Sequence, residues 1–360
     1  MLPWLAFLGN IVYNTVNAVE KNPMNSFRPG GTANQEEPGA SRPPGFSAVQ
    51  ENPGIPATFP EERMTAMKMG RNLFVAVTAL LVIIIVAISA MTLAQGPRTS
   101  SVELIRRSGS TADVNDLYEG NTTIPFYEIP QNTYKPDDFT EDNGMIEYVG
   151  PEKTYVGINV NEKKGDIDWE QVKNTVDYAM IRVGHREYMR GRIIADSKFE
   201  QNIKGATDAG IPVGVYFYSQ AVSDAEAEAE ASFVLEHIRN YSMTYPVAIY
   251  WEYKLKEDGS QDENSRTVRC NGDQVTGFID AFCGKIKNAG YTPCYYADKA
   301  MAYNRLDLSR LSNYDLWYAE YRPAPSFFYD FKIWQYTKEG EVPGISEKVP
   351  INISFKTYKN

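Results

Sequence analysis

From Tyr155 to the C-terminus, short apolar runs alternate with longer segments in which apolar residues recur every three or four positions. The short runs predict buried strands, and the longer periodicity predicts amphipathic helices. The predicted strands are residues 155–160, 178–183, 212–218, 246–251, 293–296, 315–319, 332–335 and 351–355. The predicted helices are residues 168–175, 198–209, 224–240 and 272–289.

This alternation of strands and helices predicts an α/β fold. Eight strands with intervening helices favour a compact, irregular (β/α)-barrel, TIM-like in plan, whose last strands leave little room for helices. An open, doubly wound sheet is the alternative, but no G-x-G-x-x-G or P-loop motif follows any of these strands. We therefore expect residues 151–360 to form one barrel domain.

A different apolar pattern covers residues 72–95, which carry no charge at all. At about 1.5 Å per residue, a helix of this length crosses a hydrocarbon core of roughly 30 Å. The segment therefore predicts a transmembrane helix, with a buried core helix as the alternative. Basic residues flank it almost equally, and the two nearest on the N-terminal side, Lys68 and Arg71, favour a cytoplasmic N-terminus and an extracytoplasmic C-terminal domain.

The segments on either side of this helix differ in composition. Residues 1–71 are rich in proline, with eight prolines between residues 22 and 60, which predicts a mostly disordered tail that we place in the cytoplasm. Residues 96–150 are acidic, with ten acids against three basic residues in the range 103–147. We interpret this range as an acidic stalk or linker, part of which could dock on the barrel.

Composition excludes several kinds of chemistry. The 360 residues carry a net charge of −10, which argues against a nucleic-acid partner because phosphate binding needs clustered basic residues. The chain has two histidines and three cysteines without C-x-x-C spacing, so we expect no metal centre, and no cofactor motif is present. Cys283 and Cys294 are predicted to lie on a helix and the strand that follows, where a disulfide and two buried thiols are equally compatible with the pattern.

The C-terminal ends of the predicted strands are rich in aromatic and amide side chains. In a (β/α)-barrel these ends surround the functional site. Aromatic faces and hydrogen-bonding groups together suit a carbohydrate ligand, although packing of the barrel would also explain many of the rings. The predicted glycan-binding residues are Arg182, Tyr216, Tyr218, Trp317, Tyr321, Trp334, Gln335 and Asn352.

Several of these segments resemble a known family. YVGINVNEKKGDIDWEQVK, YAMIRVG, AGIPVGVYFYSQA, YPVAIYWE and IWQYTKEGEVPGISEKVPINISF are similar, in the same order, to glycoside hydrolase family 25, the lysozyme-like muramidases. The resemblance covers about residues 154–357. It implies a flattened (β/α)-barrel and cleavage of the bond between N-acetylmuramic acid and N-acetylglucosamine in peptidoglycan.

The catalytic positions that the resemblance implies are degenerate. The family pattern G-x-D-x-S has Asn159 in place of its acid, D-x-E has Tyr250 in place of its first acid, and V-D-x-N has Pro350 in place of its acid. Glu252 remains as the general-acid candidate. Glycoside hydrolysis usually needs two carboxyl groups, and Glu320 is a weak candidate for the second. An ion pair of Glu252 with Arg182 or another basic side chain in the barrel mouth is the structural alternative.

Together these patterns predict a single-pass membrane protein with an extracytoplasmic, family-25-like domain directed at peptidoglycan. We expect its hydrolase activity to be lost or much reduced, so that the domain binds cell-wall glycan or a protein of the cell envelope. One alternative is an active, membrane-tethered muramidase that uses Glu252. Another is a scaffold in which the barrel is a protein-interaction module.

Overall fold

The computed structural model describes residues 74–75, 77–82, 100–142 and 144–358 of the chain. The chain divides into two compact units, residues 1–80 and 81–360. Residues 74–75 and 77–82 of the predicted transmembrane helix are helical, and the rest of that helix and the predicted tail over residues 1–71 lie outside the described residues. Within the described residues, no helix has both the length and the apolar character needed to cross a bilayer.

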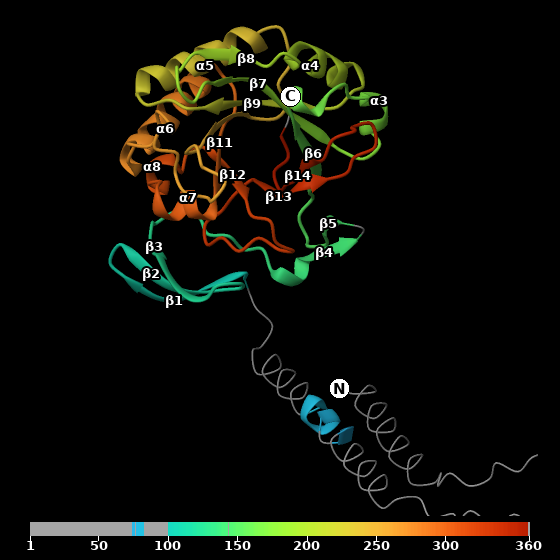
Figure 1. The fold of residues 1–360 in the computed structure, drawn as a ribbon, viewed down its shortest axis with the longest axis vertical. Helices are drawn as coiled ribbons and strands as arrows, with labels where there is room; N and C mark the ends of the chain where they lie inside the picture. The colour runs from blue at the N-terminus through green and yellow to red at the C-terminus, as the bar shows by residue number, and fades with distance from the viewer. Residues whose placement is uncertain (1–73, 76, 83–99, 143, 359–360) are drawn as a thin grey trace, which may run out of the picture. The chain divides into compact units, whose positions relative to one another are not determined.

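Eight strands close into a barrel, in the order β6-β14-β13-β12-β11-β10-β9-β7, and β7 pairs with β6 to complete the ring (Figure 1). A ninth strand, β8 (Ile193–Ala195), pairs with β7 outside the ring. The barrel strands are β6 (Tyr155–Val160), β7 (Tyr178–Arg186), β9 (Val213–Ser219), β10 (Val247–Trp251), β11 (Pro293–Asp298), β12 (Asp315–Ala319), β13 (Ile333–Gly340) and β14 (Val349–Ser354). The eight strands predicted from the apolar runs are thereby all present.

Helices cover only part of the ring. Between β6 and β12 lie η2 (Glu162–Lys164), α3 (Trp169–Val172), α4 (Phe199–Asp208), α5 (Asp224–Ile238), α6 (Gly272–Asn288), α7 (Lys299–Asn304) and α8 (Leu308–Leu311).

The barrel is compact and irregular, as predicted, but the prediction that it is a TIM-like (β/α)-barrel is wrong. No helix occurs between β12 and β14 among the described residues, and β14 runs antiparallel to both of its neighbours. The physical reason is loop length, because a parallel crossover needs a dozen or more residues whereas a short connection favours an antiparallel hairpin. The eight residues 341–348 that join β13 to β14 are too few for a crossover.

Alternation along the strands separates an inner from an outer set of side chains. In β10, Ala248 belongs to a cluster inside the ring. Val247 and Ile249 belong to the large core between the outer face of the sheet and the elements that pack around it, such as α5 and α6. The inner cluster consists mainly of aromatic and sulfur-containing residues: Tyr178, Met180, Tyr216, Tyr245, Ala248, Cys294, Tyr296, Trp317, Ala319 and Ile333. All three cysteines are free, so Cys283 and Cys294 are two buried thiols and form no disulfide.

The range 96–150 contains regular structure that the predicted stalk did not include. β1 (Val102–Ser108), β2 (Thr111–Asp116) and β3 (Gly120–Pro125) form an antiparallel sheet, and η1 (Pro136–Asp138) precedes a hairpin of β4 (Phe139–Asp142) and β5 (Met145–Tyr148). We call residues 100–142 and 144–150 the N-terminal cover. These strands contain few aliphatic residues, so hydrophobic alternation did not reveal them.

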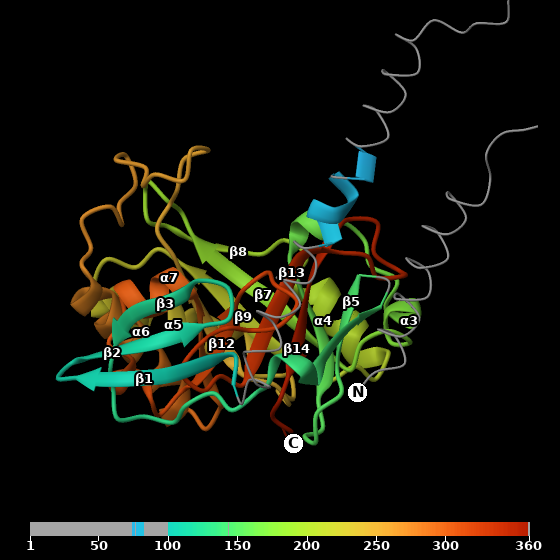
Figure 2. The same ribbon diagram turned by 90° about the horizontal axis from the view of Figure 1, so that it is seen from below.

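The N-terminal cover packs on the barrel where helices are missing. Tyr134 stacks on Phe355 with ring centroids 4.1 Å apart. Phe139 packs edge to face with Trp334, on the outer side of the barrel, with ring centroids 5.3 Å apart. The Asn132 side-chain amide donates a hydrogen bond to the Phe327 carbonyl at 2.9 Å. Figures 1 and 2 show β3 beside α7, with the β4–β5 hairpin near β13 and β14. The cover therefore replaces the helices that a regular barrel would place over its last strands.

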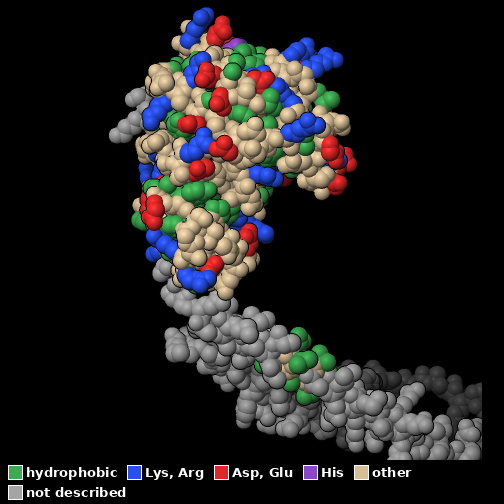
Figure 3. All heavy atoms as spheres, turned by 90° about the vertical axis from the view of Figure 1, so that its left-hand side faces the viewer, with side chains coloured by type: hydrophobic (Ala, Val, Ile, Leu, Met, Phe, Trp, Pro, Cys, Tyr) green, Lys and Arg blue, Asp and Glu red, His purple; other side chains and the backbone are tan. Residues whose placement is uncertain are grey.

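The exposed surface mixes both signs of charge. On the face shown in Figure 3, basic side chains are interspersed with acidic ones over the described part of the second unit. Exposed ion pairs such as Lys204–Asp208, with 2.7 Å between Nζ and Oδ2, are examples. Pairs of this kind contribute about 0–1 kcal/mol each to stability, so the fold depends on its aromatic cores.

Candidate functional site

Three buried amides fill the centre of the barrel mouth. Oδ1 of Asn159 accepts hydrogen bonds from Nε2 of Gln335 at 2.9 Å and from Nδ2 of Asn352 at 3.3 Å. Oδ1 of Asn352 in turn accepts from the Trp317 indole at 2.9 Å. All of these side chains are buried. The centre of the mouth is therefore a neutral network of mutually hydrogen-bonded side chains, without a carboxylate among them.

Tyr250 stacks on Tyr296, with ring centroids 3.8 Å apart and an interplanar angle of 22°. The cause is strand register, because β10 and β11 are parallel with Ile249 opposite Tyr295, so the next residues are also neighbours. The Tyr250 ring also lies 5.2 Å from that of Tyr218. Burial raises the pKa of the Tyr250 hydroxyl well above its ordinary value, so the ring is neutral. A bulky neutral ring thus occupies the barrel mouth beside Glu252.

Glu252 immediately follows β10 and faces the barrel mouth. The Tyr218 hydroxyl donates a hydrogen bond to its Oε1 at 2.6 Å. Burial raises the pKa of the Glu252 carboxyl, and the nearby Asp298 raises it further, whereas the hydroxyls of Tyr218 and Tyr250 and the ammonium of Lys338 lower it. A carboxyl group that holds its proton to higher pH is a suitable proton or hydrogen-bond donor.

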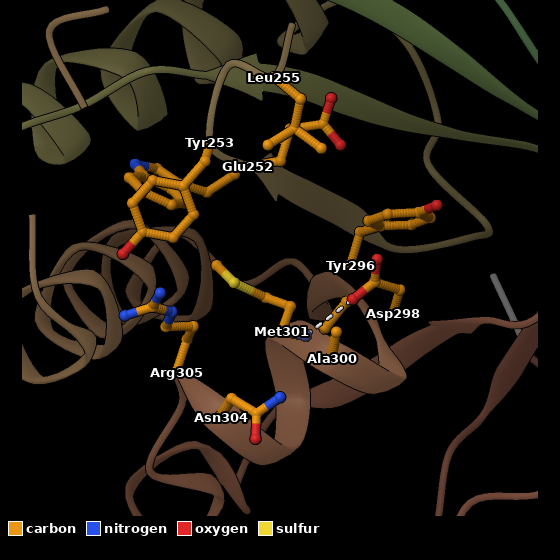
Figure 4. Close-up of a pocket in the computed structure, with 11 residues that line it drawn as sticks. Glu252, Tyr253, Leu255, Tyr296, Asp298, Ala300, Met301, Asn304 and Arg305 are labelled. Atoms are coloured by element: carbon orange, nitrogen blue, oxygen red, sulfur yellow. Dashed lines mark hydrogen bonds between the residues drawn. The ribbon is translucent and has the colours of Figure 1, made fainter. Parts of the chain in front are cut away.

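A cavity of about 270 Å³ opens beside Glu252, between the loop after β10 and helix α7 (Figure 4). Its lining residues are Trp251, Glu252, Tyr253, Leu255, Tyr296, Ala297, Asp298, Ala300, Met301, Asn304 and Arg305. The cavity therefore continues sideways from the mouth.

Sequence reasoning missed Asp298, a second acid in this cavity. Its Oδ1 accepts a hydrogen bond from the Met301 backbone amide at 2.7 Å, which makes it the N-cap of α7. Continuing the β10–β11 register from Ile249 and Tyr295 by three residues puts Asp298 beside Glu252. Register between neighbouring strands is the signal that could have found it, because the predicted strand ended two residues too early, at Tyr296.

Arg182 and Glu320 do not reach Glu252 through ion pairs or hydrogen bonds. Arg182 pairs with Asp196 and Glu162, each at 2.7 Å, so the predicted Arg182–Glu252 alternative is wrong. The Glu320 carboxylate accepts from Ser326 Oγ at 2.9 Å and lies 3.1 Å from Lys299 Nζ. Glu320 follows the outward-facing Tyr318 by two residues and shares its face of β12, so its geometry gives no support for a role with Glu252.

The predicted glycan-binding residues separate into buried and accessible ones. Arg182, Tyr216, Trp317, Gln335 and Asn352 are buried in or around the mouth, and Trp334 is buried on the outer face under the N-terminal cover. Tyr218 is partly exposed and Tyr321 is 45% exposed. Tyr321 also donates to Oε1 of Gln335 at 3.0 Å, which ties this exposed ring to the amide network. Pro350 lies in β14 on the face of Asn352, two residues before it.

The fold and these positions agree with a sequence-based family assignment. The family model of glycosyl hydrolases family 25 matches residues 158–345, just over half of the chain. The chain belongs to this family. The matched range begins inside β6 and ends before β14, so it excludes the N-terminal cover.

Two curated proteins are similar to this chain. An autolytic lysozyme of Clostridium acetobutylicum is 27% identical over 53% of this chain and 52% of its own length. A D-alanyl-L-alanine endopeptidase of Streptococcus phage B30 is 27% identical over 38% of this chain and 31% of its own length. The chain thus spans about half of the first relative and a third of the second.

Similar solved structures have low sequence identity. The modular autolysin LytC from Streptococcus pneumoniae is 22% identical with a TM-score of 0.49, covering 70% of this chain and 57% of that one. A family 25 glycosyl hydrolase from Bacillus anthracis is 21% identical with a TM-score of 0.46, covering 56% of this chain and 88% of that one.

Proposed function

We propose that this chain is a membrane-anchored, extracytoplasmic family 25 domain that binds peptidoglycan glycan and has lost most or all of its hydrolase activity. The observation that carries the proposal is the neutral mouth, in which Asn159 is held by amides and Tyr250 is stacked on Tyr296. Neither side chain can accept a proton or balance the positive charge that develops on a sugar ring during cleavage.

The expected loss of rate is large. Removing one well-placed electrostatic group commonly lowers kcat by about 10²–10³. Three such groups are replaced, by Asn159, Tyr250 and Pro350. Glu252 therefore remains as a proton donor, without the carboxylates that would complete the reaction. A donor and accessible aromatic rings still suit binding, because sugar hydroxyls accept hydrogen bonds and sugar faces pack on Tyr218 and Tyr321.

Membrane anchoring is supported by the exposed apolar side chains of residues 74–82. Phe74 is 73% exposed, Val75 61% and Leu80 58%. Such a helical surface is stabilised when lipid covers it. The uncharged sequence that continues to residue 95 extends this apolar stretch.

A second candidate function, an active muramidase, is favoured by one observation. Asp298 lines the same cavity as Glu252 and is its neighbour by strand register. Neighbouring strands lie about 4.8 Å apart, a spacing that would let these two carboxyl groups flank one glycosidic bond. In this alternative, Glu252 is the acid and Asp298 is the second carboxylate.

The deciding experiment incubates the purified full chain with insoluble peptidoglycan and measures both cleavage and binding. We expect no new reducing ends by muropeptide analysis, and sedimentation of the protein with the wall. New muramic acid reducing ends that disappear in both Glu252→Gln and Asp298→Asn would establish the active muramidase instead. Failure of the protein to sediment would contradict glycan binding and favour a protein-interaction scaffold.

A further inference from the structure

The cavity beside Glu252 has opposite charges at its two ends. Figure 4 shows the carboxyl groups of Glu252 and Asp298 on one side and the guanidinium of Arg305 on the other, beside Tyr253. Arg305 is exposed, and its Cζ lies 5.4 Å from the centroid of the Tyr253 ring. Among residues 100–142 and 144–358, no carboxylate lies within ion-pairing distance of this guanidinium.

Between the charged ends, the lining is apolar. Leu255 is 50% exposed, and Met301 and Ala300 present further apolar surface from α7. The ring of Tyr253 is fixed because its hydroxyl donates to the Cys270 carbonyl at 2.7 Å. A ring held in this way also restricts the Arg305 guanidinium that packs on it, so the cation is oriented before a ligand arrives.

A plain glycan strand does not match this arrangement. Neutral sugar hydroxyls do not compensate the positive charge of a free guanidinium, whereas a carboxylate does so and binds it through two parallel hydrogen bonds. The opposite end offers acceptor oxygens on Asp298 and Glu252, which suit amide N–H groups or an ammonium. Short apolar side chains would fit the middle, against Leu255 and Met301. The complementary ligand is a short acidic peptide in an extended conformation.

We propose that this cavity binds the acidic peptide stem that peptidoglycan carries beside its glycan, with Arg305 pairing with a carboxylate of the stem. The inference rests on the proposed function, because it takes the glycan to lie in the adjoining mouth. It assigns to Arg305 a role in specificity: the protein prefers wall material that retains its peptides. Within residues 100–142 and 144–358, Arg305 forms no hydrogen bond or ion pair with Glu252.

The test compares two soluble preparations of glycan strands from the same peptidoglycan, because removing every peptide also removes the cross-links that keep the wall insoluble. In one preparation an endopeptidase has cut only the cross-links, so the strands keep their peptides, and in the other an amidase has removed the peptides. The affinity of the full chain for each preparation is measured by titration. We expect about tenfold tighter binding to the strands that keep their peptides, the effect of one charge-assisted pair. Arg305→Ala should abolish this preference. Arg305→Lys should retain part of it, because an ammonium keeps the positive charge but cannot form the bidentate pair of hydrogen bonds.

Arg322→Ala is the matched control, since Arg322 also packs over a tyrosine ring, that of Tyr118 at 5.2 Å, but does not line the cavity. It should keep the preference unchanged. A second measurement titrates the peptides released by the amidase into the full chain, where the wild type should bind and Arg305→Ala should not.

The outcomes separate the two proposals. Equal affinity of the wild type for strands with and without peptides would overturn the peptide site and leave glycan binding in place. Binding of the released peptides without any binding of the stripped strands would overturn glycan binding and support the peptide site. An equal loss of preference in Arg322→Ala and Arg305→Ala would also overturn the assignment, because it would show a general charge effect.

Discussion

The rings of Tyr250 and Tyr296 stack with their centroids 3.8 Å apart. Tyr296 is buried, with 5% of its surface exposed, and Tyr250 is partly buried and packs against the inner aromatic cluster. A carboxylate at position 250 would lose this contact and would have to be desolvated against a tyrosine. A tyrosine at this position therefore completes the packing of the barrel interior.

Replacing Tyr250 should cost stability as well as change the site. We expect Tyr250→Ala to lower the free energy of unfolding by about 3–5 kcal/mol, since it leaves a cavity next to Tyr296. Urea unfolding followed by fluorescence measures the change. Tyr321→Ala is the control, because its ring is 45% exposed and should cost about 0.5 kcal/mol. Equal losses in both variants would contradict the packing role of Tyr250.

Stability should depend on pH through Glu230, which is fully buried in α5. Its Oε1 accepts from Arg186 Nε at 2.6 Å, yet burial outweighs this bond and that from Ser219 and raises the pKa of Glu230 to about 7. The folded state then binds the proton more tightly than the unfolded chain. The free energy of unfolding should therefore fall by about 3 kcal/mol as pH rises from about 4.5 to about 7.

Glu230→Gln should remove this slope, because an amide does not titrate in that range. The measurement is urea unfolding at a series of pH values between 4.5 and 7.5. Glu228→Gln, an exposed neighbour on the same helix, should leave the slope intact. A slope that persists in Glu230→Gln would assign the pH dependence to another group.

The N-terminal cover should be required for a stable barrel. Trp334, Tyr318 and Phe331 are at most 1% exposed, and the cover contributes to burying this outer face. A chain that begins at residue 151 should therefore unfold at a lower temperature than one that begins at residue 100, and should bind a hydrophobic dye. Calorimetry and dye fluorescence measure both effects. Equal melting temperatures would show that the cover is dispensable.

Lys299 should be the most sensitive ionic contact between the cover and the barrel. Its Nζ lies 3.0 Å from Oδ2 of Asp116 in β2 and 3.1 Å from Oε1 of Glu320. Lys299→Met leaves two largely buried carboxylates unpaired, so we expect a loss of about 3–5 kcal/mol in the free energy of unfolding. Lys204→Met, which breaks the exposed pair with Asp208, should cost less than about 1 kcal/mol. Similar costs for the two variants would contradict the role of Lys299.

The barrel strands could be predicted because each is a short apolar run with turn residues at its ends. The predicted strands over residues 155–160 and 315–319 coincide with β6 and β12. The strands of the cover could not be found in this way, because β2 (TADVND) and β3 (GNTTIP) contain too few apolar residues to form an apolar run. They are stabilised instead by pairing with each other and by contacts far along the chain.

The candidate site was predicted in part. Glu252 could be found from its place after a strand and from the family pattern, and the structure puts it beside a cavity. Alternation alone would have placed Glu320 on the outer face with Tyr318. Asp298 could have been found only by extending the strand register of β10 and β11 beyond the predicted strand. Arg305 could not be found, because it reaches the cavity through the position of α7 against the loop after β10, which no local pattern encodes.

The N-terminal cover is made first but docks on strands that are made last. Tyr118 exchanges hydrogen bonds with the backbone of Ala324, 206 residues further along the chain. During synthesis, the cover therefore has no partner surface on the barrel until α7 has left the ribosome, and that surface is incomplete until β12, β13 and β14 have followed. Contacts of such long sequence separation form slowly, and the cover leaves its aromatic residues open to other chains in the meantime. We expect the closing of the barrel and the docking of the cover to be a single, late step in folding.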